Sequence, residues 1–408
     1  LPVAMTSFNS DSEEEKSFGI KIYEVISNNL EYSGLFRQIS QNAFLQSENE
    51  VFRQPFFADW RLIDANLIIS GQVKLIDDSL IIRIKLWDVY QEKLILNKKI
   101  AGIKSENWRL LSHIISNLVY ESVTGQVGYF DTKIVYVAEE GFGKKKTKRL
   151  AIMDYDGENH KYLTNGKNLV LTPRFSPSGK EIVYLSYFKN KPSVYLLNLS
   201  NNKKRILGKF SGMSFAPRFS SDGKNIVFSL TKKGSSNIYI LDLEIKKKFQ
   251  ITRNKYINTS PSFSPDAKRI VFSSDRAGKQ NLYIKEKNSN KSPVRISFGE
   301  GQYATPVWSP RGDYIAFTKS YRKKFFIGLM KSNGKNERII SEGYLAEGPS
   351  WSPNGRTLAF NKVEKSINGK LTSKIFTIDV TGNLEKELFT PKEASDPDWG
   401  PSIKINTN

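Results

Sequence analysis

A short phrase recurs along the second two thirds of the chain, and it constrains the fold more than any other feature of the sequence. At Pro349 it reads Pro-Ser-Trp-Ser-Pro-Asn-Gly-Arg. The full copies open at Pro173, Pro217, Pro261, Pro306 and Pro349, and a shortened copy opens at Pro397. The steps between these prolines are 44, 44, 45, 43 and 48 residues. A near-constant period of this length indicates one supersecondary unit that is copied in series.

Each copy predicts four short strands. A bulky ring follows the proline by two residues, and then comes Ser-Pro-Asp-Gly or a relative, whose residue types suit a hairpin turn. A β-branched run such as Ile226-Val227-Phe228 follows, then a third run and a weaker fourth one. Four strands in a repeat of this size are typical of a propeller blade. Ala267 replaces the turn glycine in one copy, so we expect strain or a different turn shape there.

The copies do not start in phase with the blades. Residues 133–137, 150–154 and 161–164 match the second, third and fourth strands of a blade that lacks its first strand, whereas Pro397 opens a first strand with nothing after it. Joining the two gives six complete blades. We therefore predict a six-bladed β-propeller in which 397–401 is the innermost strand of blade one, so that the chain ends close the ring and remove an open sheet edge.

The first part of the chain predicts a separate α/β domain, and we place the domains at 1–127 and 128–408. Strands are expected at 1–8, 35–44, 67–69, 80–84 and 94–100. Helices are expected after Ser12, over 55–64 and after Ser105, and their apolar stripes are interpreted as core. His113 lies off the last stripe, so we expect it on the surface.

Composition narrows the classes of function. The chain has no Cys and two His, which excludes thiol chemistry and leaves little for a histidine metal site. No apolar run is long enough to span a membrane. Residues 1–127 hold 13 Lys/Arg and 16 Asp/Glu, so the net charge of +21 comes from the rest, at +24. The simpler interpretation is a solvated surface; the alternative is a face that attracts an acidic protein, lipid headgroups or nucleic acid.

We find no enzyme motif in the sequence: no Walker loop, no dinucleotide fingerprint and no Gly-x-Ser-x-Gly elbow. We therefore expect no catalytic residue, no cofactor and no metal. Function should then lie in surfaces, above all in the loops that enter the inner strands and surround one mouth of the central channel. Their aromatic and polar residues are candidate protein contacts, and the alternative is that they simply plug the mouth. These candidates include Tyr256, Tyr303, Thr305 and Tyr344.

The junction between the two parts carries a more specific signature. Val123-Thr124-Gly125, Gly128-Tyr129-Phe130 and Lys133-Ile134-Val135-Tyr136-Val137 are similar to the Leu-Thr-Gly, Gly-x-Phe and Arg-Ile-Ala-Tyr-Val of a known family. Together with the repeats, they make the chain resemble the TolB family, the periplasmic component of the Tol–Pal system of Gram-negative bacteria.

The resemblance implies a non-catalytic periplasmic scaffold. Such proteins bind the peptidoglycan-associated lipoprotein Pal across the propeller mouth and TolA through an N-terminal extension, which here should precede Leu1. They support outer-membrane integrity, constriction at cell division and, in some hosts, colicin uptake. The Pal contacts implied by the resemblance fall on Met213, Ala216, Thr259 and Ser260. Met213 stands where relatives carry His, and Ser260 where they carry Glu.

Two alternatives from other classes stay open at this stage. One is a propeller hydrolase, lyase or glycan-binding protein that uses acidic residues of the channel. The other, motivated by the basic charge, is a nucleic-acid-binding propeller. Our expectation is a monomer with protein partners, Pal, TolA and other envelope proteins, and without nucleic acid or membrane insertion.

Overall fold

The computed structural model describes residues 1–102, 105–141, 146–188, 191–208, 213–365 and 369–403, with the backbone alone at 105, 188 and 213–215. It divides into two compact units, Leu1–Asp131 and Thr132–Ile403, which are described separately. Among the described residues, no helix combines the length and the apolar character needed to cross a membrane.

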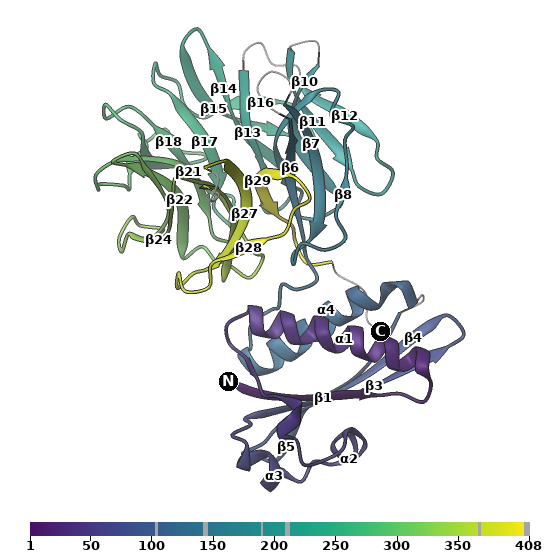
Figure 1. Cartoon of the computed structure of the whole chain (residues 1–408). Helices are drawn as coiled ribbons and strands as arrows, with labels where there is room; N and C mark the ends of the chain where they lie inside the picture. Colours follow the sequence, from purple (N-terminus) through teal and green to yellow (C-terminus); the bar gives the residue numbers. More distant parts are fainter. Residues whose placement is uncertain (103–104, 142–145, 189–190, 209–212, 366–368, 404–408) are drawn as a thin grey trace. The chain divides into compact units, whose positions relative to one another are not determined.

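The first unit is a five-stranded mixed sheet in the order β2-β1-β3-β4-β5. Helices α1 and α4 lie on one of its faces, and α2 and α3 on the other (Figure 1). The strands are β1 (Pro2–Asn9), β2 (Arg37–Gln38), β3 (Leu67–Ile76), β4 (Ser79–Asp88) and β5 (Lys93–Gly102). The helices are α1 (Glu13–Tyr32), α2 (Glu48–Arg53), α3 (Phe57–Leu62) and α4 (Trp108–Thr124), with 3-10 turns η1 (Gln41–Ala43) and η2 (Ser105–Asn107).

Local sequence explains the ends of the long helices. Ser12 caps α1 by accepting a hydrogen bond from the Glu15 backbone, whereas the Glu15 carboxylate accepts from Asp11 and Leu75 and thereby ties the helix to β3. Gly125 ends α4 with a φ of 67°. The expected strand over 35–44 is reduced to the two residues of β2.

The prediction of a surface His113 is wrong. Its side chain is 2% exposed, and Nδ1 lies 3.0 Å from Nδ2 of Asn29 on α1. Asn29 also donates to Ser116, one turn further along α4. His113 lies off the apolar stripe of α4 but on a side of this helix that α1 covers. A polar pair between α1 and α4 therefore replaces the expected contact with solvent.

The second unit consists of six four-stranded antiparallel sheets arranged as a propeller (Figure 1). The innermost strands contact one another in the closed ring β9-β13-β17-β21-β25-β29. They are β9 (Leu169–Phe175), β13 (Met213–Phe219), β17 (Asn258–Phe263), β21 (Gln302–Trp308), β25 (Leu345–Trp351) and β29 (Glu393–Trp399).

Second strands follow the turns of the repeat, and third and fourth strands complete each blade. The second strands are β6 (Lys133–Glu140), β10 (Glu181–Phe188), β14 (Asn225–Lys232), β18 (Arg269–Ser274), β22 (Tyr314–Tyr321) and β26 (Thr357–Lys365). The third strands are β7 (Thr147–Asp154), β11 (Lys191–Asn198), β15 (Ser235–Asp242), β19 (Asn281–Glu286), β23 (Lys324–Lys331) and β27 (Leu371–Asp379). The fourth strands are β8 (Lys161–Tyr162), β12 (Lys204–Gly208), β16 (Lys248–Gln250), β20 (Val294–Arg295), β24 (Arg338–Gly343) and β28 (Lys386–Leu388).

The predicted closure of the ring is confirmed. Strand β29 pairs antiparallel with β6, from Glu393 opposite Glu139 to Trp399 opposite Ile134. The indole Nε1 of Trp399 donates to the hydroxyl of Thr132 at 2.7 Å. The two ends of the propeller chain are thus joined in one sheet, and the β6 edge is covered.

Candidate functional site

The most unusual backbone of the propeller lies in its inner strands, immediately before the repeated prolines. All six of these residues have positive φ values, between 44° and 67°, and five of them are not glycine. The six positions, which we call the bulge residues, are Thr172, Ala216, Ser260, Thr305, Gly348 and Asp396. Since a residue before proline is normally extended, the conformation is uncommon at every one of them.

Strand pairing explains what the bulge residues do. In each blade the register between the inner and second strands shifts at this point, which is the mark of a β-bulge. The residue skipped on the second strand is always a buried aromatic. These six are Tyr184, Phe228, Phe272, Phe317, Phe360 and Tyr136, each at most 3% exposed. The same device is therefore built six times around one axis, next to the aromatic core of each blade.

The bulge residues mark one end of the bore, which we call the mouth. Each inner strand begins two or three residues before its bulge residue, and its first residues pair with the end of the second strand, as Met213 pairs with Thr231. The other end, where the inner strands run into the Ser-Pro-Asp-Gly turns, we call the turn end. Strained backbone clusters at binding and catalytic sites more often than elsewhere, so the ring of bulge residues makes the mouth the candidate site.

Two hydrogen bonds of one hydroxyl group connect bulge residues of neighbouring blades at the mouth. The hydroxyl of Thr318 lies 2.7 Å from that of Thr305 and accepts from the Gly348 backbone at 3.2 Å. These three residues belong to blades five and six, so the contact crosses a blade boundary. The mouth is thus preformed in the free protein, which reduces the entropy lost when a partner binds.

The structure brings together three of the residues that the sequence singled out. Ala216, Ser260 and Thr305 are equivalent bulge residues of blades three, four and five, and all three are partly exposed. Thr259 precedes Ser260 on β17 and is partly exposed as well. Met213 is the first residue of β13, but its side chain lies outside the described residues.

The tyrosines behave differently from one another. Tyr344 is 66% exposed, between β24 and β25. Tyr256 is partly buried in the loop before β17, with the guanidinium of Arg276 5.9 Å from its ring centre. Tyr303 corrects the sequence interpretation: it is fully buried, and its hydroxyl donates to Glu337 at 2.8 Å. Strand alternation turns its ring into the blade, so it offers no surface to a partner.

Acidic residues of blades six and one were missed by the sequence analysis. Glu347 precedes the bulge residue Gly348, and burial, reinforced by the charge of Asp396, raises the pKa of its carboxyl. Burial also acts on Glu139, but hydrogen bonds from Lys146, Lys148 and Ser395 outweigh it and lower the pKa of that carboxyl. The Glu139 carboxylate therefore stays charged and links β6, β7 and β29.

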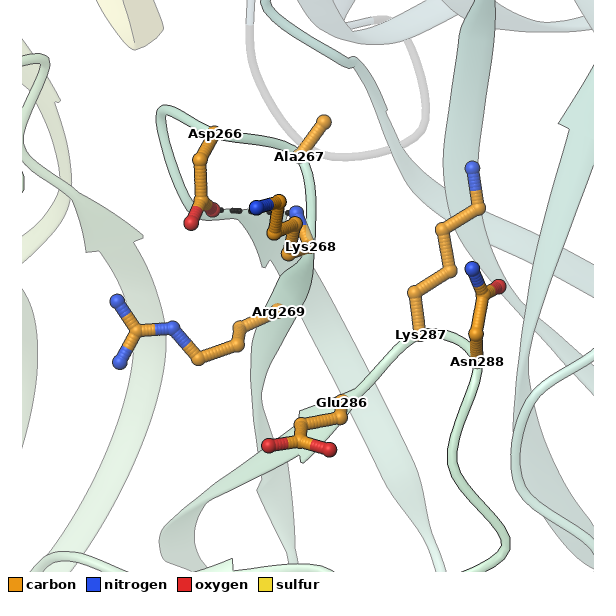
Figure 2. Close-up of a pocket in the computed structure, with 7 residues that line it drawn as sticks. All are labelled: Asp266, Ala267, Lys268, Arg269, Glu286, Lys287 and Asn288. Atoms are coloured by element: carbon orange, nitrogen blue, oxygen red, sulfur yellow. Dashed lines mark hydrogen bonds between the residues drawn. The ribbon is translucent and has the colours of Figure 1, made fainter.

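A pocket lies elsewhere, on the turn side of blade four. It has a volume of about 740 Å³ and is lined by Asp266, Ala267, Lys268, Arg269, Glu286, Lys287 and Asn288. Figure 2 shows Asp266 bonded to the backbone of Lys268, with Arg269 and Lys287 on opposite sides of the pocket. Acidic and basic groups alternate there without converging on one point, so this pocket offers no focused site.

Basic residues occur at both ends of the blades. Lys232 and Lys233 lie in a hairpin at the mouth, whereas Lys224 and Lys268 lie in turns at the opposite end. The positive charge of the propeller is therefore not concentrated on the mouth.

Comparison with known proteins identifies both units. Residues 1–95 match the model of the TolB amino-terminal domain, and residues 120–403 match that of the TolB beta propeller domain. The chain is 50% identical to the Tol-Pal system protein TolB of Rickettsia prowazekii over 409 residues, with 98% of this chain and 92% of the relative covered. It is 49% identical to the protein of the same name from Rickettsia felis, with 98% and 91% covered.

A solved structure agrees with these sequence matches. The crystal structure of TolB from Acinetobacter baumannii superimposes with a TM-score of 0.87 at 26% identity, covering 98% of this chain and 96% of that one. The likeness extends over both units, so the pairing of the two domains in one chain is shared as well as each fold.

Proposed function

The chain belongs to the TolB family of non-catalytic Tol-Pal scaffolds, and from this premise we propose that it binds the peptidoglycan-associated lipoprotein Pal at the mouth of its propeller. The proposed contacts are Met213, Ala216, Thr259, Ser260, Tyr256, Thr305 and Tyr344. We also propose a periplasmic location and a role in outer-membrane integrity and cell division.

The observation that carries the proposal is the ring of bulge residues. Three of its members, Ala216, Ser260 and Thr305, are positions that the sequence had marked for partner contact. Their side chains are short, so a partner can approach the backbone closely around the bore. The register shifts behind them are anchored on buried aromatics, so the surface keeps its shape without a partner.

Two substitutions at the mouth test this proposal. Ala216→Arg and Ser260→Arg add a long charged side chain at positions whose left-handed backbone already carries a Cβ atom, so neither adds backbone strain. We expect each to weaken Pal binding at least about tenfold by calorimetry, which corresponds to about 1.4 kcal/mol. Ser200→Arg is the matched control, because Ser200 is exposed in the loop between β11 and β12 at the opposite end.

All variants should give the circular dichroism spectrum of the unaltered protein. Tight binding of Pal by both mouth variants would contradict the proposal, and so would an equal loss in the Ser200→Arg control.

TolA is the second proposed partner, through residues that precede Leu1. A chain that carries those residues should capture TolA from solution more strongly than the chain that starts at Leu1. Equal capture by the two would place the TolA contact elsewhere.

A further inference from the structure

A second cavity lies on the propeller axis, at the turn end of the bore. Its volume is about 210 Å³. It is lined by the last two residues of all six inner strands, from Arg174 and Phe175 in blade two to Asp398 and Trp399 in blade one. The wall is completed by turn residues, namely Ser221, Ser264-Pro265 and Ser309-Pro310. A cavity that touches equivalent positions of every blade must lie on the common axis.

The residues that directly follow the repeated prolines form the innermost ring of this cavity. They are Arg174, Arg218, Ser262, Val307, Ser350 and Asp398. Three of them join neighbouring blades by accepting a backbone hydrogen bond from the next inner strand. Asp398 accepts from Phe175, Ser262 from Trp308 and Ser350 from Trp399, at 2.8, 3.3 and 3.0 Å.

The two arginines cannot take part in this pattern, because a guanidinium has no acceptor. Arg174 is buried and Arg218 is mostly buried, with side chains 7% and 14% exposed. They share one carboxylate: Oδ1 of Asp398 lies 3.7 Å from Nε of Arg174 and 3.6 Å from Nη1 of Arg218. These separations are ion pairs but too long for hydrogen bonds.

Asp398 is already occupied by other donors. Oδ2 accepts from the Phe175 backbone, and Oδ1 accepts from the Ser350 hydroxyl at 2.9 Å. Arg174 gives one bond to the neighbouring Pro173 carbonyl, but its buried Nε has no hydrogen-bond partner among the described residues. No hydrogen bond from Arg218 is found within the described part of the chain either.

The cavity wall thus holds two positive charges, those of Arg174 and Arg218, and one negative charge, that of Asp398. Some of the guanidinium N–H groups have no acceptor among the described residues. Burial, and after it the charge of Arg174, lowers the pKa of Arg218 to about 9, although the charges of Asp398 and of Asp396 act in the opposite direction. A largely buried charge that is only partly compensated is costly unless a counter-ion or hydrogen-bond acceptors are supplied. The missing partner is an anion with several acceptor oxygens.

We propose that the turn end of the bore is a binding site for a compact oxyanion, a carboxylate or a phosphate group, held by Arg174 and Arg218. Guanidinium forks bind both groups through paired hydrogen bonds, which suits two arginines facing one cavity. The volume equals that of roughly seven water molecules, so it holds a small anion or the charged end of a side chain. Ser262 and Ser350 add hydroxyl groups to the wall.

The site is separate from the proposed Pal contacts, which lie at the mouth, and the two proposals can fail independently. The anion could be a small ion in solution, inorganic phosphate or a small carboxylate. It could equally be a phosphorylated or acidic group that belongs to a partner. Both present the same oxygens to the arginines.

Anion titration of the purified chain tests the site. Inorganic phosphate and acetate are added separately at constant ionic strength maintained with sodium chloride, and tryptophan fluorescence is recorded, since Trp308, Trp351 and Trp399 line the cavity. We expect saturable binding in the millimolar range for at least one of them, confirmed by calorimetry. A preference for phosphate indicates a phosphate-bearing ligand, and a preference for acetate a carboxylate.

Variants locate the binding. Arg218→Gln should weaken it at least about tenfold, as expected for the loss of charge-assisted hydrogen bonds. Arg311→Gln is the matched control, because Arg311 is about half exposed in a turn at the same end but does not line the cavity. Should Arg218→Gln fail to fold, Arg218→Lys keeps the charge and loses the fork, and a loss of about threefold or more is expected.

Three results would overturn the proposal. The first is an unaltered protein in which neither anion gives a saturable signal beyond chloride. The second is native affinity in a folded Arg218→Gln or Arg218→Lys variant. The third is an equal loss in Arg311→Gln, which would indicate adventitious binding to surface charge.

Discussion

The two ends of the propeller bore are built from positions only two residues apart on the same six strands, yet they hold different side chains. At the mouth stand the small, left-handed bulge residues before the prolines, and few of them bond to a neighbouring blade. At the turn end, Asp398, Ser262 and Ser350 accept hydrogen bonds across blade boundaries. The difference indicates that the ring is held together at the turn end, which leaves the mouth available for recognition.

The largest effect is expected from Asp398→Ala. The substitution removes the acceptor for Phe175 and Ser350 and leaves Arg174 and Arg218 without their shared carboxylate. Loss of one partner from a buried charge cluster lowers the free energy of unfolding by about 3–5 kcal/mol. Urea denaturation followed by tryptophan fluorescence measures it. Asp396→Ala, two residues away at the mouth, should have a much smaller effect, and equal losses would erase the proposed difference between the ends.

A smaller decrease in the free energy of unfolding is expected from Ser350→Ala. The hydroxyl donates to Asp398 and accepts from the Trp399 backbone, so its removal leaves a buried N–H group unpaired. We expect a decrease of about 1–3 kcal/mol in the free energy of unfolding. Ser260→Ala at the mouth is the comparison and should stay within about 0.5 kcal/mol. If both serines gave the same small change, the hydrogen bond across the closing blade boundary would be unimportant.

The turn of blade four offers a test of strain at the turn end. Ala267 has a φ of 55°, as its replacement of the usual glycine predicted. A Cβ atom on the equivalent glycines, Gly223 and Gly312, would be in ordinary van der Waals contact with the proline of the preceding turn, at 3.8 and 3.7 Å. Ahead of Ala267 that proline is replaced by Ser221, whose hydroxyl donates to Pro265 at 2.6 Å. The strain at Ala267 therefore lies in its own backbone and not in a clash with the preceding turn (Figure 2 shows Ala267 in its turn).

We accordingly expect Ala267→Gly to raise the free energy of unfolding by up to about 1 kcal/mol without altering partner binding. Ser221→Pro removes the hydrogen bond to the Pro265 carbonyl and should lower the free energy of unfolding by about 0.5–1.5 kcal/mol, to the same extent with and without Ala267→Gly. A thermal unfolding cycle of the three variants measures the coupling. A strong coupling between the two substitutions would contradict the assignment of the strain to the Ala267 backbone.

The smallest effect concerns the charge of Glu347 at the mouth. Burial, and then Asp396, raises the pKa of this carboxyl above its ordinary value of 4.5. A raised pKa means that the folded state favours the protonated form, so the stability it contributes is present at low pH and lost as the pH rises through the folded pKa. Glu347→Gln should therefore be more thermostable than the unaltered protein at pH 7.5, and the gain should shrink toward pH 4.

Asp396→Asn is the control for this pH dependence, since it removes the second cause of the shift. In that background the gain from Glu347→Gln should be smaller. A gain that is independent of pH would contradict the assignment to the Glu347 carboxyl.

Sequence periodicity predicted the blades and the closing strand because both depend on local pattern and on chain order. It did not predict the environment of residues whose contacts lie far away in the sequence. His113 is buried by Asn29, which is 84 positions away in the sequence. The bulge residues were not foreseen because proline normally keeps its predecessor extended. From the sequence alone, Arg174 and Arg218 would be expected on the surface. In the structure, closure of the ring places both beside the carboxylate of Asp398.

The central claim is that the mouth, and not the turn end, is the protein-binding end of the bore. Hydrogen–deuterium exchange of the purified chain, with and without Pal, tests it most directly. We expect slower exchange at 298–305 and 341–348 on binding, with 264–269 and 309–314 unchanged. Protection confined to these two turns, with the mouth segments unaffected, would contradict it.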